Sequence, residues 1–109
     1  MYLVSVGGMK IRGWSAFFRV IRSTYAALRA ARAAEGCVHA DIFREGRRYF
    51  AVSVWDSKDA MKAFAHTGVH GALMRDQAKL MVDFVNHSYE SDSIPTRAQA
   101  SAIWHATQG

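Results

Sequence analysis

The sequence predicts an α+β fold in which helices pack on a four-stranded antiparallel sheet, with an extra helix at the C-terminus. Two observations predict it. Four short segments are rich in Val, Ile, Tyr and Phe, as strands are, and the segments between them repeat apolar residues at helical spacing. The 109 residues suffice for one domain, which we expect to span residues 1–109.

The first two predicted elements are a strand and a long helix. Segment 2–11 is rich in β-forming residues, and Gly7-Gly8 predicts a bulge or a kink within it. Ser15 is the expected N-cap of the helix, because its hydroxyl can accept a hydrogen bond from the first turn. Apolar residues continue at helical spacing to about Ala34, and Gly36 ends the helix.

A hairpin and the remaining elements follow. Residues 45–47, Glu-Gly-Arg, predict the hairpin turn, since glycine accepts a positive φ. Asp56 and Asp59 predict a helix start with an acidic capping box. The predicted elements after residue 36 are strands 37–43 and 48–55, helix 57–66, a helical segment 69–81, strand 84–89 and a C-terminal helix from Pro95 to about Thr107.

This β-α-β-β-α-β order is that of a ferredoxin-like domain, with both connecting helices on one face of the sheet. The other face would then be bare. Because a soluble monomer does not tolerate a large exposed apolar area, we expect a second copy of the chain to cover this face, giving a two-fold homodimer joined through its sheets.

The chain is basic, with a formal net charge of +5. A basic balance is typical of nucleic-acid-binding proteins, but Arg19, Arg22, Arg29 and Arg32 fall at helical spacing and predict a solvated helix face. The sequence holds no run of five basic residues and no aromatic RNA-binding motif. We therefore expect no nucleic-acid partner and regard a site for an anionic small molecule as equally compatible with the charge.

The cysteine content and the hydropathy of the chain indicate where in the cell the protein is located. The single cysteine, Cys37, excludes an internal disulfide and fits a reducing cytoplasm. No stretch approaches the roughly 20 apolar residues that cross a membrane. The N-terminus also lacks the basic start of a signal peptide. We expect a cytoplasmic protein with no membrane partner.

His70 is the candidate catalytic residue. It follows Gly68 at the start of the second helical segment, where an imidazole can face the sheet. It could act as a general base, a metal ligand or an axial haem ligand, or serve packing alone. His66 lies four residues earlier, but Gly68 interrupts the helical geometry of a two-histidine metal site, and no metal site is predicted.

Trp55, Phe64 and Met74 are the candidate substrate-binding residues. Aromatic and thioether side chains can wall a pocket for an apolar or aromatic small molecule, although such residues also form ordinary core. The sequence has no phosphate-binding loop, no dinucleotide-binding glycine motif and no nucleophile elbow. Kinase, nicotinamide-dependent and serine-hydrolase functions therefore have no support.

Residues 54–65 read VWDSKDAMKAFA and are followed by Gly68-Val69-His70. This pattern resembles the dimeric α/β-barrel superfamily, and its first part also occurs in the antibiotic-biosynthesis monooxygenases. The histidine fifteen residues after Trp55 narrows the resemblance to the small proteins grouped with spheroidene monooxygenase. The resemblance implies a ferredoxin-like protomer, a sheet-to-sheet dimer and a pocket between the sheet and the second helix. It makes His70 the candidate haem ligand, although the sequence requires no cofactor.

Two departures argue against haem degradation. Haem-degrading relatives carry a second tryptophan where this chain has Phe64, and an asparagine on the first strand where this chain has Ser5, Val6 or Gly7. Three hypotheses follow. The chain is a monooxygenase-like enzyme for an apolar or aromatic substrate, with or without haem. Alternatively, it is a non-catalytic dimer that binds a small molecule. The third hypothesis is nucleic-acid binding through the arginine face.

Overall fold

Four antiparallel strands form one sheet in the spatial order β2-β3-β1-β4. The computed structural model describes residues 1–11, 13–65 and 81–108. The described elements are β1 (Tyr2–Ile11), α1 (Gly13–Ala33), β2 (Cys37–Glu45), β3 (Arg48–Trp55), α2 (Lys58–Ala65), β4 (Met81–Ser91) and α4 (Arg97–Gln108). This confirms the α+β class and the ferredoxin-like arrangement with an additional C-terminal helix.

Several element boundaries differ from the predicted ones. The irregularity of β1 lies between Gly8 and Lys10, where its register against β4 shifts, whereas its pairing with β3 is continuous across both glycines. Helix α1 begins at Gly13, so Ser15 is inside the helix. Strand β4 starts at Met81, a residue that we expected at the end of a helical segment. The rest of that predicted helical segment lies outside the described residues.

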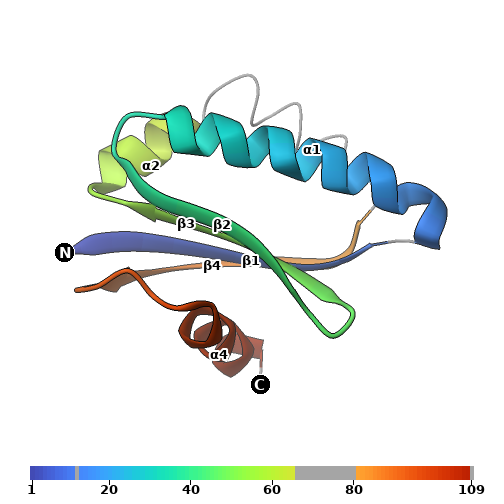
Figure 1. The fold of residues 1–109 in the computed structure, drawn as a ribbon. Coiled ribbons are helices and arrows are strands. Elements are labelled where there is room, and N and C mark those ends of the chain that lie inside the picture. The colour runs from blue at the N-terminus through green and yellow to red at the C-terminus, as the bar shows by residue number, and fades with distance from the viewer. Residues whose placement is uncertain (12, 66–80, 109) are drawn as a thin grey trace.

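Helices α1 and α2 lie on one face of the sheet, here called the helix side (Figure 1). Two small apolar clusters hold α1 there. Val20 packs with Met9 of β1, and Leu28 and Ala31 pack with Ala40 of β2. The long helix therefore crosses the sheet obliquely, from β1 toward the edge strand β2.

Helix α4 lies on the opposite face (Figure 1). Its Ala100 and Trp104 are 1% and 2% exposed and pack in the largest described apolar cluster. The sheet residues of that cluster are Val4, Val6, Phe50, Val52 and Val54. The expectation of a bare second face is therefore wrong, because the C-terminal helix covers the centre of it. A homodimer stays a prediction, but it would have to form around α4 or elsewhere.

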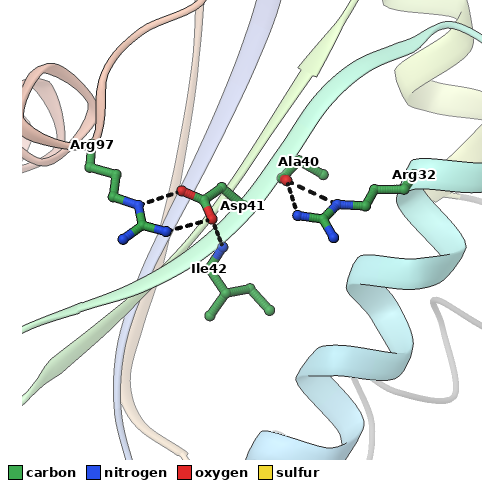
Figure 2. Close-up of polar contacts among 5 residues, drawn as sticks. All are labelled: Arg32, Ala40, Asp41, Ile42 and Arg97. Carbon is green, nitrogen blue, oxygen red and sulfur yellow. Dashed lines mark hydrogen bonds and ion pairs between the residues drawn. The ribbon is translucent and has the colours of Figure 1, made fainter.

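Edge strand β2 accepts hydrogen bonds from a helix on each side of it (Figure 2). On one side the Arg32 guanidinium of α1 donates two hydrogen bonds to the Ala40 carbonyl, at 3.3 and 3.0 Å. On the other side the Arg97 guanidinium of α4 donates two hydrogen bonds to the Asp41 carboxylate, at 2.6 and 3.1 Å. These contacts satisfy polar groups that an edge strand would otherwise present to solvent. Within the described ranges, no helix is long and apolar enough to span a membrane.

Candidate functional site

The helix side of the sheet carries small side chains at its centre. Two neighbouring rows cross all four strands there, as the strand register shows. The first row contains Ala40, Ser53, Ser5 and Ser88, and the second contains Ile42, Ala51, Gly7 and Asn86. Strands usually carry large β-branched and aromatic residues at such positions. Helix α1 covers the short side chains nearest β2, because Leu28 and Ala31 pack on Ala40, and Ala51 packs against the cluster of Met9 and Val20.

An aromatic pair borders these rows. The rings of Trp55, at the end of β3, and Phe64, on α2, lie 5.2 Å apart between centroids with a tilt of 33°. Trp55 is 1% exposed, and Phe64 is half-buried. Helix α2 begins directly after β3, with the Ser57 hydroxyl accepting a hydrogen bond from the Ala60 backbone N–H at 3.1 Å. This cap fixes the start of α2 and so brings Phe64 back over Trp55.

The buried indole is held by a hydrogen bond to its own strand. Trp55 Nε1–H donates to Ser53 Oγ at 2.9 Å. The two residues are two positions apart on β3 and therefore share the helix side. A buried indole N–H without an acceptor costs free energy, so Ser53 both satisfies Trp55 and sets its ring orientation.

A second polar contact joins strands β1 and β4. The Ser5 hydroxyl of β1 donates to Asn86 Oδ1 of β4 at 3.0 Å. Ser5 lies directly opposite Ser53 in the strand register. Polar side chains of three adjacent strands thus extend from Ser53, which contacts Trp55, through Ser5 to Asn86 on the edge strand β4. Their hydroxyl and amide groups can bind a polar atom of a ligand.

The described histidines lie away from this site. His39 and His87 face α4, because their register partners Val54 and Val6 belong to the cluster under that helix. His105 is on α4 itself, 3.0 Å from the Glu45 carboxylate. Among the described residues no group of three His, Cys, Asp or Glu side chains could hold a metal ion. On the helix side, the described part of the chain therefore offers haem iron no imidazole.

Two of the four predicted site residues are found together. Trp55 and Phe64 form the aromatic pair, as a shared pocket wall requires. The other two, His70 and Met74, lie outside the described residues, as does His66. Local sequence patterns do not mark Ser5 or Asn86 as site residues. The available signal was polar residues at alternate positions in strands that are otherwise apolar.

Cys37 does not have the surroundings of a nucleophile. Burial raises the pKa of its thiol above the usual value. A raised pKa reduces the thiolate fraction at neutral pH, and the thiolate is the reactive form. A low thiolate fraction fits a structural thiol at the start of β2.

Residues 19–76 match the sequence model of a family described as antibiotic biosynthesis monooxygenase. The match covers more than half of the 109 residues and includes both members of the aromatic pair. The chain belongs to this family. The resemblance expected from the Trp55 motif is confirmed at the level of the antibiotic biosynthesis monooxygenase family, while membership of the narrower spheroidene monooxygenase branch stays a prediction.

Solved structures share the fold of this family member. A Deinococcus radiodurans protein, described as a candidate antibiotic biosynthesis monooxygenase, superposes with a TM-score of 0.77 at 14% identity, over 86% of this chain and 96% of its own. A similarly described Nitrosomonas europaea protein gives 0.77 at 11% identity, over 87% and 94%. SnoaB of Streptomyces nogalater, a cofactor-independent oxygenase studied as a mutant, gives 0.74 at 14%, over 85% and 95%. Such identities establish the fold alone. No curated protein matches the chain by sequence.

Proposed function

We propose that this family member is a small oxygenase that binds an apolar or aromatic molecule on the helix side of the sheet, against Trp55 and Phe64. The observation that carries the proposal is the aromatic pair beside a sheet centre of small side chains. Aromatic walls with a few placed polar groups are typical of small-molecule sites. Met74 and His70 complete the proposed site, with Met74 contacting the substrate.

We propose further that the reaction needs no resident cofactor. The described residues offer no metal ligand cluster, and one structural neighbour is described as a cofactor-independent oxygenase. The substrate must then supply the electrons. In a balanced reaction, an activated CH2 group and O2 give a C=O group and H2O. The carbon loses four electrons and two protons, one oxygen atom enters the carbonyl, and the other leaves as water. His70 would accept the first proton.

The direct test uses anthrone, a tricyclic ketone whose CH2 group lies between two aromatic rings. Oxygen uptake and quinone absorbance are recorded with the wild-type protein, with a Phe64→Ala variant and without protein. We expect the wild-type protein to accelerate the reaction and the variant to lose most of that acceleration. The matched control is Phe43→Ala, because Phe43 stacks on Phe50 at 5.2 Å, on the face under α4. Equal rates for the two variants would contradict the proposed site.

A visible spectrum tests the version with haem. If His70 binds haem iron, added haem gives a shifted Soret band that a His70→Ala variant loses. Without such a band, only the cofactor-free version remains. If anthrone binds without turnover, the chain is instead the non-catalytic small-molecule-binding protein.

Assembly and location are further parts of the proposal. The 12.1 kDa chain should form a homodimer, for which light scattering would report twice that mass. A mass equal to one chain at micromolar concentration would end the dimer proposal. We place the protein in the cytoplasm, where a lone thiol such as Cys37 stays reduced.

A further inference from the structure

We propose that the outward face of α1 docks the protein on the surface of an anionic lipid membrane. Four exposed residues make the contact and are here called the aromatic–arginine stripe: Phe18, Arg22, Tyr25 and Arg29. The partner is a bilayer whose headgroups carry net negative charge. The stripe lies on the side of α1 that faces away from the sheet, so this inference does not rest on the proposed oxygenase reaction.

Helix geometry places the four side chains of the stripe on one line. They follow one another at i, i+4, i+7 and i+11, so they project within an arc of about 60° and extend for about 17 Å along the helix. Helix α1 covers the sheet with its other face (Figure 1). The residues that are buried on that face are Val20, Thr24, Leu28 and Ala31. The stripe therefore points away from the sheet.

The two aromatic rings of the stripe are exposed to solvent. Phe18 is 71% exposed and Tyr25 is 52% exposed. Single exposed apolar side chains are ordinary on a protein surface, but these two rings lie two helical turns apart on the same line. Because Phe18 has no polar group, moving its ring from water into the headgroup region of a bilayer lowers the free energy. The rings are thus suited to enter the membrane interface.

The arginines of the stripe carry charge that no neighbouring acid neutralises. The segment Gly13–Ala33 contains no Asp or Glu. Arg22 and Arg29, together with Arg19 beside the stripe, are exposed and form no ion pair with a described residue. Guanidinium groups bind phosphate oxygens in a bidentate manner, and basic side chains at an anionic membrane surface strengthen binding. Charge complementarity therefore favours anionic over zwitterionic lipid.

A nucleic acid is the other polyanion with phosphate groups for these arginines. Proteins that bind single strands hold them in a charged groove, whereas the stripe lies on the convex surface of a helix. Such a line matches a flat boundary, at which rings enter the interface and guanidinium groups stay among the phosphates. A surface contact of this kind needs no membrane-spanning helix. It replaces the expectation of no membrane partner, which considers only spanning segments and signal peptides.

The experiment is a vesicle flotation assay. It compares vesicles of phosphatidylcholine alone with vesicles that also contain about 30% phosphatidylglycerol. We expect the wild-type protein to bind only the anionic vesicles, and less tightly as salt is added. Arg22→Gln/Arg29→Gln should lower the affinity about thirtyfold, or about fivefold for each arginine. Phe18→Ser, which leaves the charge unchanged, should lower it about tenfold. Circular dichroism checks that the variants keep the fold, as changes at exposed positions should.

The matched control is Arg44→Gln/Arg47→Gln, which removes the same charge from exposed positions in the hairpin of β2 and β3, away from α1 (Figure 1). It should bind nearly as well as the wild-type protein. An equal loss in both double variants would show that only net charge matters, and would overturn the stripe. An unchanged affinity of Phe18→Ser would overturn the entry of the ring into the membrane.

Oligonucleotides provide the competing result. Fluorescence anisotropy measures binding of a labelled single strand and a labelled duplex at the same salt concentration. If the wild-type protein binds either one but no vesicle, and Arg22→Gln/Arg29→Gln loses that binding, the stripe is a nucleic-acid surface and the membrane proposal is wrong. The proposal also fails if the wild-type protein binds neither vesicles nor oligonucleotides. None of these outcomes alters the anthrone test, so the proposed function stands or fails separately.

Discussion

Trp104 of α4 lies directly against Gly8 of β1, on the face of the sheet opposite the candidate site. A β-carbon built at Gly8 would be 2.6 Å from indole atoms Cε2 and Cζ2. The Trp104 N–H also donates to the Val85 carbonyl at 2.9 Å, so the ring is held on one side by Gly8 and on the other by β4. The close approach requires glycine at position 8 and lets the Trp104 ring of α4 pack directly on the β1 backbone.

We expect Gly8→Ala to destabilise the fold, because the indole would have to leave its place in a close-packed cluster. Overpacking of this kind costs about 1–3 kcal/mol. Urea unfolding followed by circular dichroism measures the change in the free energy of unfolding. Gly46→Asn is the comparison, since a β-carbon at Gly46 meets nothing within 4 Å and asparagine tolerates its φ of 62°. Equal stability of Gly8→Ala and the wild-type protein would show that Trp104 does not pack against Gly8.

We expect low pH to weaken the packing of α4 against the sheet. Hydrogen bonds from Arg97 lower the pKa of Asp41, and hydrogen bonds from Ser101 and His105 lower the pKa of Glu45. A carboxyl group whose pKa is lower in the folded chain stabilises the fold above its unfolded pKa, and this contribution is lost as pH falls through the folded value. Stability should therefore decline as pH drops below about 4, the usual range of both carboxyls.

The Asp41→Asn variant checks this account. It lacks the Arg97 ion pair at every pH, so we expect it to be less stable than the wild-type protein near neutral pH. Towards lower pH the two proteins should converge. The Arg97 side chain is 64% exposed, so solvent screens the ion pair, and the difference should be small and should shrink with added salt. If the difference in the free energy of unfolding is the same at neutral and acid pH, Asp41 does not contribute in this way.

The thiol of Cys37 should react slowly in the folded protein. Burial raises its pKa, which lowers the thiolate fraction at neutral pH. We expect iodoacetamide to label Cys37 more slowly in the native chain than in the chain unfolded by urea. Mass spectrometry follows the labelling, and free glutathione serves as the reference thiol. Native labelling faster than that of glutathione would instead indicate an activated cysteine.

Ser53→Ala should destabilise the protein without changing its fold. The substitution removes the acceptor of the buried Trp55 N–H, which costs about 1–3 kcal/mol if no water replaces it. Ser88→Ala, at an exposed position of the same face, is the matched control and should leave stability within about 0.5 kcal/mol. Thermal unfolding of the two variants separates these outcomes, and equal effects would show that the Ser53 hydroxyl does not hold the indole.

The sequence allowed most of the elements to be predicted but not the side on which α4 packs. The strands and helices follow from local spacing, and the hairpin turn is where Gly46 predicts it, with a φ of 62°. The face that α4 covers depends on contacts far along the chain, such as Trp104 with Gly8. Local periodicity cannot show such a contact, although a small residue in an apolar strand is a sign of close approach.

The candidate site also has one part that the sequence predicts and one part that it does not. The Trp55 motif predicted the aromatic pair, because Trp55 and Phe64 are close in sequence and α2 follows β3 directly. The contact between Ser5 and Asn86 joins residues 81 positions apart and exists only because β4 pairs with β1. The strand order that creates it is a property of the whole sheet, not of either strand.

Nuclear magnetic resonance of the tryptophan indole N–H groups tests the central claim most directly. The ¹⁵N-labelled protein is titrated with 9-fluorenone, and Trp55→Phe and Trp104→Phe variants assign the two signals. We predict that the Trp55 signal shifts progressively and saturates, while that of Trp104, on the opposite face of the sheet, does not move. A saturating shift of Trp104 with no shift of Trp55 would place the ligand on the α4 face and contradict the account.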